Sequence, residues 1–287
     1  MDTGGPMHRL GPAVLSASAF ACGDVVAKIA LNAGADVLTM ATFRGAIGVG
    51  FLYAWLFLGA PPQPITPRAK WISLGVGVLF TGNVFWVFKA IETIEVPVAI
   101  LTYFVYPLLT GLAAAAIGLE RLTWRGAIAA LTAFLGLALM VGAHPAGLAA
   151  IGIIAALAAA CCRVTLLLVT RAALHGTDAR LITWYSMLSS TALFVILSLA
   201  TWNWQAPATM PGWFALVALG IATTLGVLAV FVSTARIGPF RTALFMNLEP
   251  LLTTIGSALF LGEVLNPLQA LGGAVMITAL VAFQARR

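Results

Sequence analysis

Apolar residues fill almost the whole chain in blocks of about twenty, separated by Pro, Gly or charged residues. An α-helix needs about 20 predominantly apolar residues to cross the ~30 Å hydrocarbon core of a bilayer. The pattern therefore predicts ten membrane-spanning helices. The expected spans are 10–31, 37–59, 70–90, 96–119, 124–142, 147–171, 179–200, 212–234, 239–261 and 267–285. Because the blocks are apolar on every face, the alternating strands of an outer-membrane barrel are excluded.

Composition supports an all-α integral membrane protein. Of the 287 residues, 61% are hydrophobic and only 8% are charged, and the mean hydropathy is +1.04. Soluble domains carry roughly 25% charged residues, so a cytosolic globular protein is excluded. A disordered chain is excluded as well, because such chains are poor in apolar residues. The connections between spans are too short to hold a soluble domain.

The basic residues predict the orientation. The chain has 15 Lys and Arg against 9 Asp and Glu, a net charge of +6. With a cytoplasmic N-terminus, eleven basic residues fall on the cytoplasmic side, three lie within spans and only Lys89 lies outside. The eleven are Arg9, Arg68, Lys70, Arg121, Arg125, Arg171, Arg180, Arg236, Arg241, Arg286 and Arg287. This bias predicts a multi-pass protein of the cell (inner) membrane with both termini cytoplasmic. The basic residues form no cluster that indicates nucleic-acid binding.

Two segments of the chain repeat at one fixed separation. Tyr106–Thr110 (YPLLT) is followed by Glu120, and Glu249–Thr253 (EPLLT) is followed by Glu263. The separation of Pro107 from Pro250 equals that of Glu120 from Glu263, and we call it the repeat interval. This interval corresponds to five spans, and an odd number of spans reverses direction across the membrane. We therefore expect two five-helix repeats of inverted topology, 1–145 and 146–287, with the substrate site near the midplane and alternating access between them. A chance match in a Leu- and Ala-rich chain is the alternative.

The same features resemble a known family. Five plus five spans, a proline within the fourth and ninth, and an acidic residue after each are similar to the drug/metabolite transporter superfamily and its EamA-type exporters. Thr102–Pro107 (TYFVYP) resembles the aromatic segment of YddG-type aromatic amino acid exporters. The resemblance implies a ten-helix basket around a central cavity that exports amino acids or related metabolites from the cytoplasm.

Two prolines are candidate hinges. Pro107 and Pro250 lie in the middle of their spans, where the ring removes a backbone hydrogen bond and kinks the helix. Each leaves a carbonyl one turn earlier, near Tyr103 and Met246, that needs another partner or lines a cavity. A static kink is the alternative.

Five ionisable residues fall within predicted spans, where charges are costly and indicate function. They are Asp24, Lys28, Arg44, Arg163 and Glu249. Asp24 and Lys28 are spaced to pair on one helical face, and Arg44 fits a structural role, by reaching outward or by meeting Asp24. Arg163 and Glu249 lie near the midplane. Either they pair with each other or they bind substrate, and Glu249 is also a candidate to hold a proton.

Aromatic and amide side chains complete the predicted substrate site. Asn83 and Trp86, like Tyr103 and Tyr106, are three residues apart and share a helical face. An aromatic-lined cavity suits apolar or aromatic substrates, and a few polar groups would hold the two ends of a zwitterion. The predicted substrate-binding set is Asn83, Trp86, Tyr103, Tyr106, Arg163, Asn247 and Glu249.

Several functions lack their motifs. The three cysteines have no metal-ligand spacing, the three histidines are scattered, and no nucleotide-binding loop occurs. We expect no catalytic residues, metal or cofactor, and hence a secondary transporter for small metabolites, amino acids above all. A drug or nucleotide-sugar carrier is the alternative within the same class. A membrane-embedded enzyme that uses Asp24 and Glu249 as an acid pair is the alternative from another class. The oligomeric state is open, and a monomer is compatible with the sequence.

Overall fold

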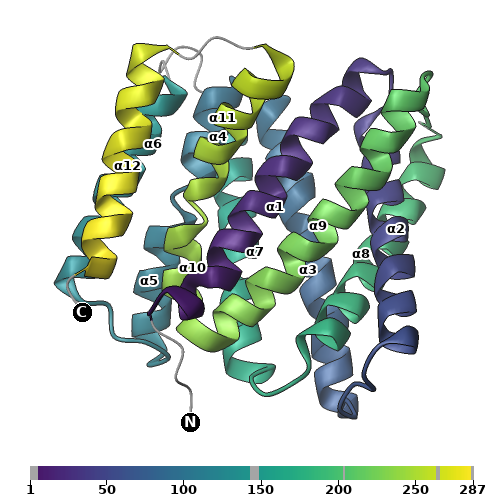
Figure 1. Cartoon of the computed structure of the whole chain (residues 1–287), viewed down its shortest axis with the longest axis horizontal. Coiled ribbons are helices and arrows are strands. Elements are labelled where there is room, and N and C mark those ends of the chain that lie inside the picture. Colours follow the sequence, from purple (N-terminus) through teal and green to yellow (C-terminus); the bar gives the residue numbers. More distant parts are fainter. Residues whose placement is uncertain (1–5, 143–148, 203, 263–265, 286–287) are drawn as a thin grey trace.

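The computed structural model describes residues 6–142, 149–202, 204–262 and 266–285, which form helices joined by short connections, with no strand among them (Figure 1). Ten segments are long and apolar enough to cross a membrane, which confirms the predicted all-α fold. The helices are α1 (Pro6–Asn32), α2 (Val37–Leu58), α3 (Pro67–Ile91), α4 (Val96–Tyr103), α5 (Tyr106–Ala116), α6 (Trp124–Val141), α7 (Ala150–Ala173), α8 (Ala179–Thr201), α9 (Met210–Ile237), α10 (Pro239–Phe245), α11 (Leu248–Leu261) and α12 (Pro267–Ala285).

Equivalent helices of the two halves begin at similar polar caps. Thr66 accepts a hydrogen bond from the Ala69 amide at 3.2 Å, and Thr209, one repeat interval later, accepts one from Gly212 at 3.4 Å. Thr123 caps α6, and Asn266, again one repeat interval later, caps α12. Such side chains satisfy the amides that a helix N-terminus leaves without partners. The repeat therefore extends to the local signals that start the helices.

The fourth and ninth spans are interrupted, not only kinked. Residues 104–105 separate α4 from α5, and residues 246–247 separate α10 from α11. Pro107 and Pro250 lie just after these interruptions and have no N–H to donate to the carbonyls of residues 103 and 246. Each of these two spans is therefore one membrane-length segment made of two helices, and the break lies at the proline that is predicted to kink it. The interruptions lie at the predicted positions.

Each half of the chain packs mainly against the other half. The main contacts of α1 are with α9, and those of α7 are with α3. Adding the repeat interval to the residue numbers of α1 gives those of α7, and adding it to α3 gives α9. The α1–α9 and α3–α7 interfaces are therefore equivalent. The same shift maps the α2–α8 and α6–α12 pairs onto themselves. The largest helix interfaces all join the first half to the second, so the halves interleave. The predicted boundary at residue 145 and the predicted anchor Glu263 lie outside the described residues.

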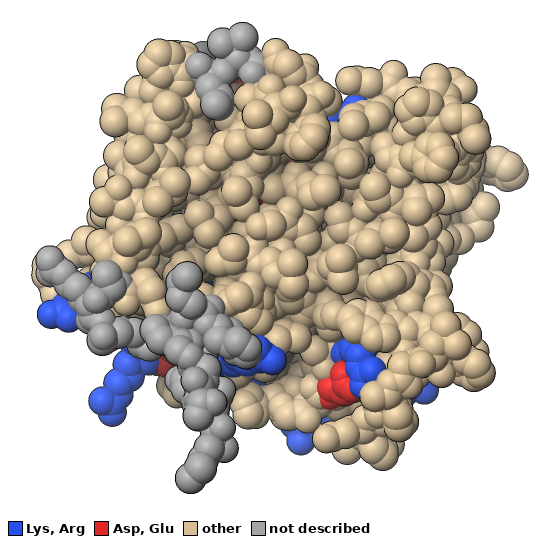
Figure 2. All heavy atoms as spheres, viewed as in Figure 1, with Lys and Arg blue, Asp and Glu red and all other residues tan. Residues whose placement is uncertain are grey.

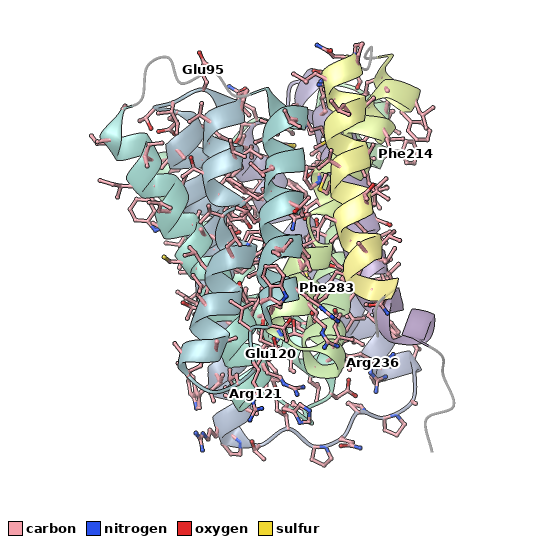
Figure 3. All side chains as sticks on the ribbon, turned by 90° about the vertical axis from the view of Figure 1, so that its left-hand side faces the viewer. Glu95, Glu120, Arg121, Phe214, Arg236 and Phe283 are labelled. Carbon is pink, nitrogen blue, oxygen red and sulfur yellow. The ribbon has the colours of Figure 1, made fainter. Side chains whose placement is uncertain are left out.

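Basic side chains gather at one end of the bundle. We call this the termini end, because α1 begins and α12 ends there (Figure 1). Figure 2 shows most of the visible Lys and Arg atoms at this end. Arg121 and Arg236 lie at the termini end and Glu95 lies at the opposite end (Figure 3). The charge asymmetry used for the orientation is therefore present in the folded chain, and the cytoplasmic location of this end stays a prediction.

Backbone contact between α6 and α12 depends on two glycines. A Cβ added at Gly272 would overlap the Gly136 carbonyl oxygen, and one added at Gly136 would lie 2.7 Å from the Gly272 carbonyl oxygen. Small residues allow such close approach in membrane helix pairs. No flexible side chain can move away to make room, because the contacted atoms belong to the backbone.

We predict that Gly272→Ala separates α6 from α12 and lowers the thermal stability of the detergent-solubilised protein. The expected cost is about 1–3 kcal/mol, the usual range for overpacking. Gly75→Ala is the matched control, because a Cβ there meets nothing within 4 Å. Equal melting temperatures for the two variants would contradict this account of the interface.

Candidate functional site

A buried guanidinium marks the centre of the bundle. Arg163 lies in the middle of α7 and is only 6% exposed. Its guanidinium carbon is 5.7 Å from the centroid of the Phe20 ring and 5.9 Å from that of the Tyr106 ring. Such cation–π contacts contribute about 2 kcal/mol each when they are desolvated. The two aromatic faces therefore offset part of the cost of burying this charge.

The residues around Arg163 are related by the repeat. Phe20 and Arg163 are one repeat interval apart, and so are Tyr106 and Glu249. The first pair lies on the equivalent helices α1 and α7, and the second pair lies at the starts of α5 and α11. Equivalent positions of two halves come together only where the halves meet. The cluster of Phe20, Tyr106, Arg163 and Glu249 therefore lies at that meeting place, as expected for a site between repeats.

Four ionisable side chains interact along this centre. Glu249 lies near enough to Arg163 for attraction and near enough to Asp24 for repulsion, and Arg44 attracts Asp24. None of the four forms a direct ion pair within the described residues, where the recorded pairs are Lys89–Glu92 and Arg180–Asp178 near helix ends. The centre thus holds two cations and two carboxyl groups that compensate one another at a distance.

Two guanidinium nitrogens in this region have no hydrogen-bond partner among the described residues. They are Nε of Arg163 and one terminal nitrogen of Arg44, and both are buried. Arg44 lies over the Phe80 ring, 5.7 Å from its centroid. A buried donor without an acceptor costs about 1–3 kcal/mol. Free donors next to aromatic faces are therefore positioned to gain from an anionic group that enters the centre.

Aromatic rings fill the interruption between α4 and α5. The ring centroids of Tyr103 and Tyr106 are 5.3 Å apart, and the Phe104 ring is 5.3 Å from Tyr103 and 5.6 Å from Tyr106. Tyr106 and Phe104 are buried, whereas Tyr103 is partly exposed. Tyr103 is therefore the member of this cluster that can contact a bound molecule.

Asp24 is accessible although it lies in the middle of α1. It accepts a hydrogen bond of 2.9 Å from the hydroxyl of Thr253, one turn after Glu249 on α11. The two carboxyl groups therefore face the same region. The predicted acid pair is close in space.

The amides predicted for the site are already engaged. The Asn83 side chain donates to the Ala159 carbonyl at 2.9 Å and joins α3 to α7 next to Tyr103. The Asn247 side chain donates to the Leu244 carbonyl at 2.8 Å, whereas its buried amide oxygen has no partner. Trp86 is 37% exposed, and its recorded ring contact is with Phe85 at 5.3 Å. The structure thus groups Tyr103, Tyr106, Arg163, Glu249 and Asn83. Trp86 stays a predicted member of the site.

Three residues that contact the site were not predicted from the sequence. Phe20 covers Arg163, Thr253 binds Asp24, and Phe80 covers Arg44. Phe20 could have been found, because it is the repeat equivalent of Arg163. Thr253 belongs to the repeated EPLLT segment, which gives it a signal in the sequence as well. Phe80 has no such signal, because its partner is on another helix.

A carboxyl group joins the two halves at the termini end. Glu120, between α5 and α6, accepts a hydrogen bond of 3.1 Å from the Phe240 amide at the start of α10. Burial raises the pKa of Glu120, although this amide and the nearby Arg171 act against the rise. Gly238 has φ +91°, and a Cβ there would overlap the Glu120 carboxylate. Glycine is therefore required where Glu120 meets this turn.

Comparisons with known proteins agree with this architecture. A model of the EamA-like transporter family matches residues 11–142 and again residues 150–283. A solved crystal structure, 21% identical in sequence, superimposes with a TM-score of 0.76 over 96% of this chain and 99% of the other. At that identity the likeness shows the fold alone. No curated protein matches the sequence.

We predict that Glu120→Gln stabilises the protein increasingly as the pH rises from 4 to 7. The raised pKa means that the folded state binds this proton more tightly than the unfolded state does. The free energy of unfolding therefore falls as the pH rises above the ordinary carboxyl value, about 4.3. Glutamine keeps the acceptor for the Phe240 amide and removes the titration. Thermal unfolding of both proteins across this range checks the prediction, and a difference that is constant with pH would refute it.

Proposed function

Because the chain belongs to the EamA-like transporter family, whose members are transporters of the drug/metabolite superfamily, we propose that it exports amino acids with apolar or aromatic side chains. The observation that carries this proposal is that cationic and carboxyl side chains lie together at the centre. Two cations, Arg44 and Arg163, and two carboxyl groups, Asp24 and Glu249, interact there next to aromatic rings. A zwitterion has one group for each kind of side chain, a carboxylate for a guanidinium and an ammonium for a carboxyl group.

Each end of an amino acid has a complementary group. The free Nε of Arg163 is a donor for the substrate carboxylate. Glu249, with Asp24 next to it, is an acceptor for the ammonium group. Tyr103 and the rings around it offer an apolar surface to the side chain. An aromatic preference similar to that of YddG-type exporters belongs to this proposal.

The packing supports transport by alternating access. Interfaces between the halves dominate, and the interruptions at 104–105 and 246–247 lie next to Tyr106 and Glu249. Movement of one half against the other would change the site and the interrupted spans together. Pro107 and Pro250 are the proposed hinges, because they prevent the two interrupted spans from closing into continuous helices.

The alternatives fit the centre less well. A nucleotide sugar carries two phosphates and needs several cations, whereas Arg163 is the one with aromatic neighbours on two sides, and Arg44 is balanced by Asp24. A cationic drug would add a third positive group to a centre in which two carboxyl groups already face two guanidinium groups. The closeness of Asp24 and Glu249 is compatible with an acid pair, but the family favours a transporter over an enzyme. The proposal includes a location in the inner membrane, with both termini in the cytoplasm.

We predict that purified protein in liposomes transports labelled phenylalanine and leucine, but neither ethidium nor a uridine diphosphate sugar. Glu249→Gln and Tyr103→Ala should each lower amino acid flux at least tenfold, through loss of the ammonium acceptor and of the aromatic surface. The matched controls are Glu92→Gln, an exposed carboxyl group at a helix end, and Tyr53→Ala, an exposed tyrosine. Unchanged flux in the two site variants would remove these residues from the site. Faster transport of ethidium or of the nucleotide sugar would overturn the substrate class.

A further inference from the structure

A cavity separate from the aromatic and charged centre lies at the termini end of the bundle. It has a volume of about 970 Å³ and lies where the start of α6 and the end of α12 approach the turn between α9 and α10. Figure 3 shows Glu120, Arg121, Arg236 and Phe283, four of its residues, close together at this end. The cavity shares no lining residue with the aromatic and charged centre. Its charged lining residues are Glu120, Arg121, Arg125, Arg171, Arg236 and Arg241.

The charges of this cavity favour an anion. Five of the six charged residues are arginines, and the one carboxylate, Glu120, already accepts from the Phe240 amide. Arg171 donates to the Ala235 carbonyl. Arg121, Arg125 and Arg236 form no hydrogen bond or ion pair with the described part of the chain. Their guanidinium groups can therefore bind phosphate oxygens, which they hold in paired hydrogen bonds.

The other part of the cavity is apolar. Ile128, Ala279 and Phe283 line it on α6 and α12, and it extends to Thr132. Thr132 is seven residues beyond Arg125 on α6, and therefore roughly 10 Å deeper. Trp124 lies at the same end and is 74% exposed, as is typical of the aromatic belt at a membrane surface. The lining thus changes from cationic at the end of the bundle to apolar further along the helices.

We propose that this cavity binds an anionic phospholipid, with the phosphate among the arginines and the first part of an acyl chain along α6 and α12. A basic pocket between membrane helices at this level is the usual binding place for anionic head groups. The apolar part distinguishes a lipid from a small phosphate compound, because a hydrated phosphate would gain nothing from Ile128 or Phe283. The proposal does not depend on the transported substrate.

Native mass spectrometry of the full chain in detergent tests this site. The protein is titrated with dioleoylphosphatidylglycerol and with dioleoylphosphatidylcholine, which have the same acyl chains. We expect the anionic lipid to bind more tightly. The double variant Arg121→Gln/Arg236→Gln should weaken its binding on the order of 30-fold, since each basic residue near the membrane surface contributes roughly a factor of five. Arg68→Gln/Lys70→Gln is the matched control. It removes the same charge from the start of α3, outside the cavity, and should leave binding within about threefold.

Competition separates the two sources of phosphate. Inorganic phosphate and glycerol 3-phosphate at millimolar concentration should not displace the lipid, and displacement by either would overturn the lipid assignment. Equal affinity for the two lipids, or equal weakening in the double variant and its control, would overturn the site itself. If the double variant does not fold, the single variant Arg125→Gln serves in its place, with an expected loss of roughly fivefold.

Discussion

The arrangement of the centre depends on the buried guanidinium of Arg163. A charge at this depth in a membrane protein must be compensated by the protein itself, because neither lipid nor bulk water can do so. Phe20 and Tyr106 present their faces to it, and Glu249 attracts it from a distance. These groups come from α1, α5 and α11, so the compensation requires both halves of the chain. The Nε of Arg163 has no hydrogen-bond partner among the described residues, so it can donate to an anionic group that enters the centre.

The interrupted spans follow from the same arrangement. Backbone without regular hydrogen bonds is tolerated at membrane depth only where it is covered by protein or lines a cavity. The interruption at 104–105 is covered by Tyr103, Phe104 and Tyr106, and the one at 246–247 lies next to Glu249. Aromatic rings, ionisable side chains and the two helix interruptions are thus concentrated in one region. The termini end differs, because there Glu120 and the arginines face a cavity that opens on apolar helix surfaces.

Much of the fold could be predicted from the sequence, and the reasons are physical. The bilayer fixes helix length, so apolar blocks give the ten spans, and Pro107 and Pro250 mark the interruptions because proline lacks an N–H. Tyr103, Tyr106, Arg163 and Glu249 stand out as candidates because charges and paired aromatics are unusual within spans. Phe80, the ring that lies against Arg44, could not be predicted. Helical periodicity tells which residues share a face, but not which helix that face meets.

Recognition of both ends of a zwitterion is the central claim, and competition by substrate analogues tests it most directly. Uptake of labelled phenylalanine into liposomes is measured against phenylalanine methyl ester, which lacks the carboxylate, and against phenylpropionate, which lacks the ammonium group. A site built to bind a polar group strongly rejects an analogue without it. We predict that each analogue competes at least 100-fold more weakly than phenylalanine itself. If either analogue competes as well as phenylalanine, the assignment of Arg163 and Glu249 to the two ends of the substrate is wrong.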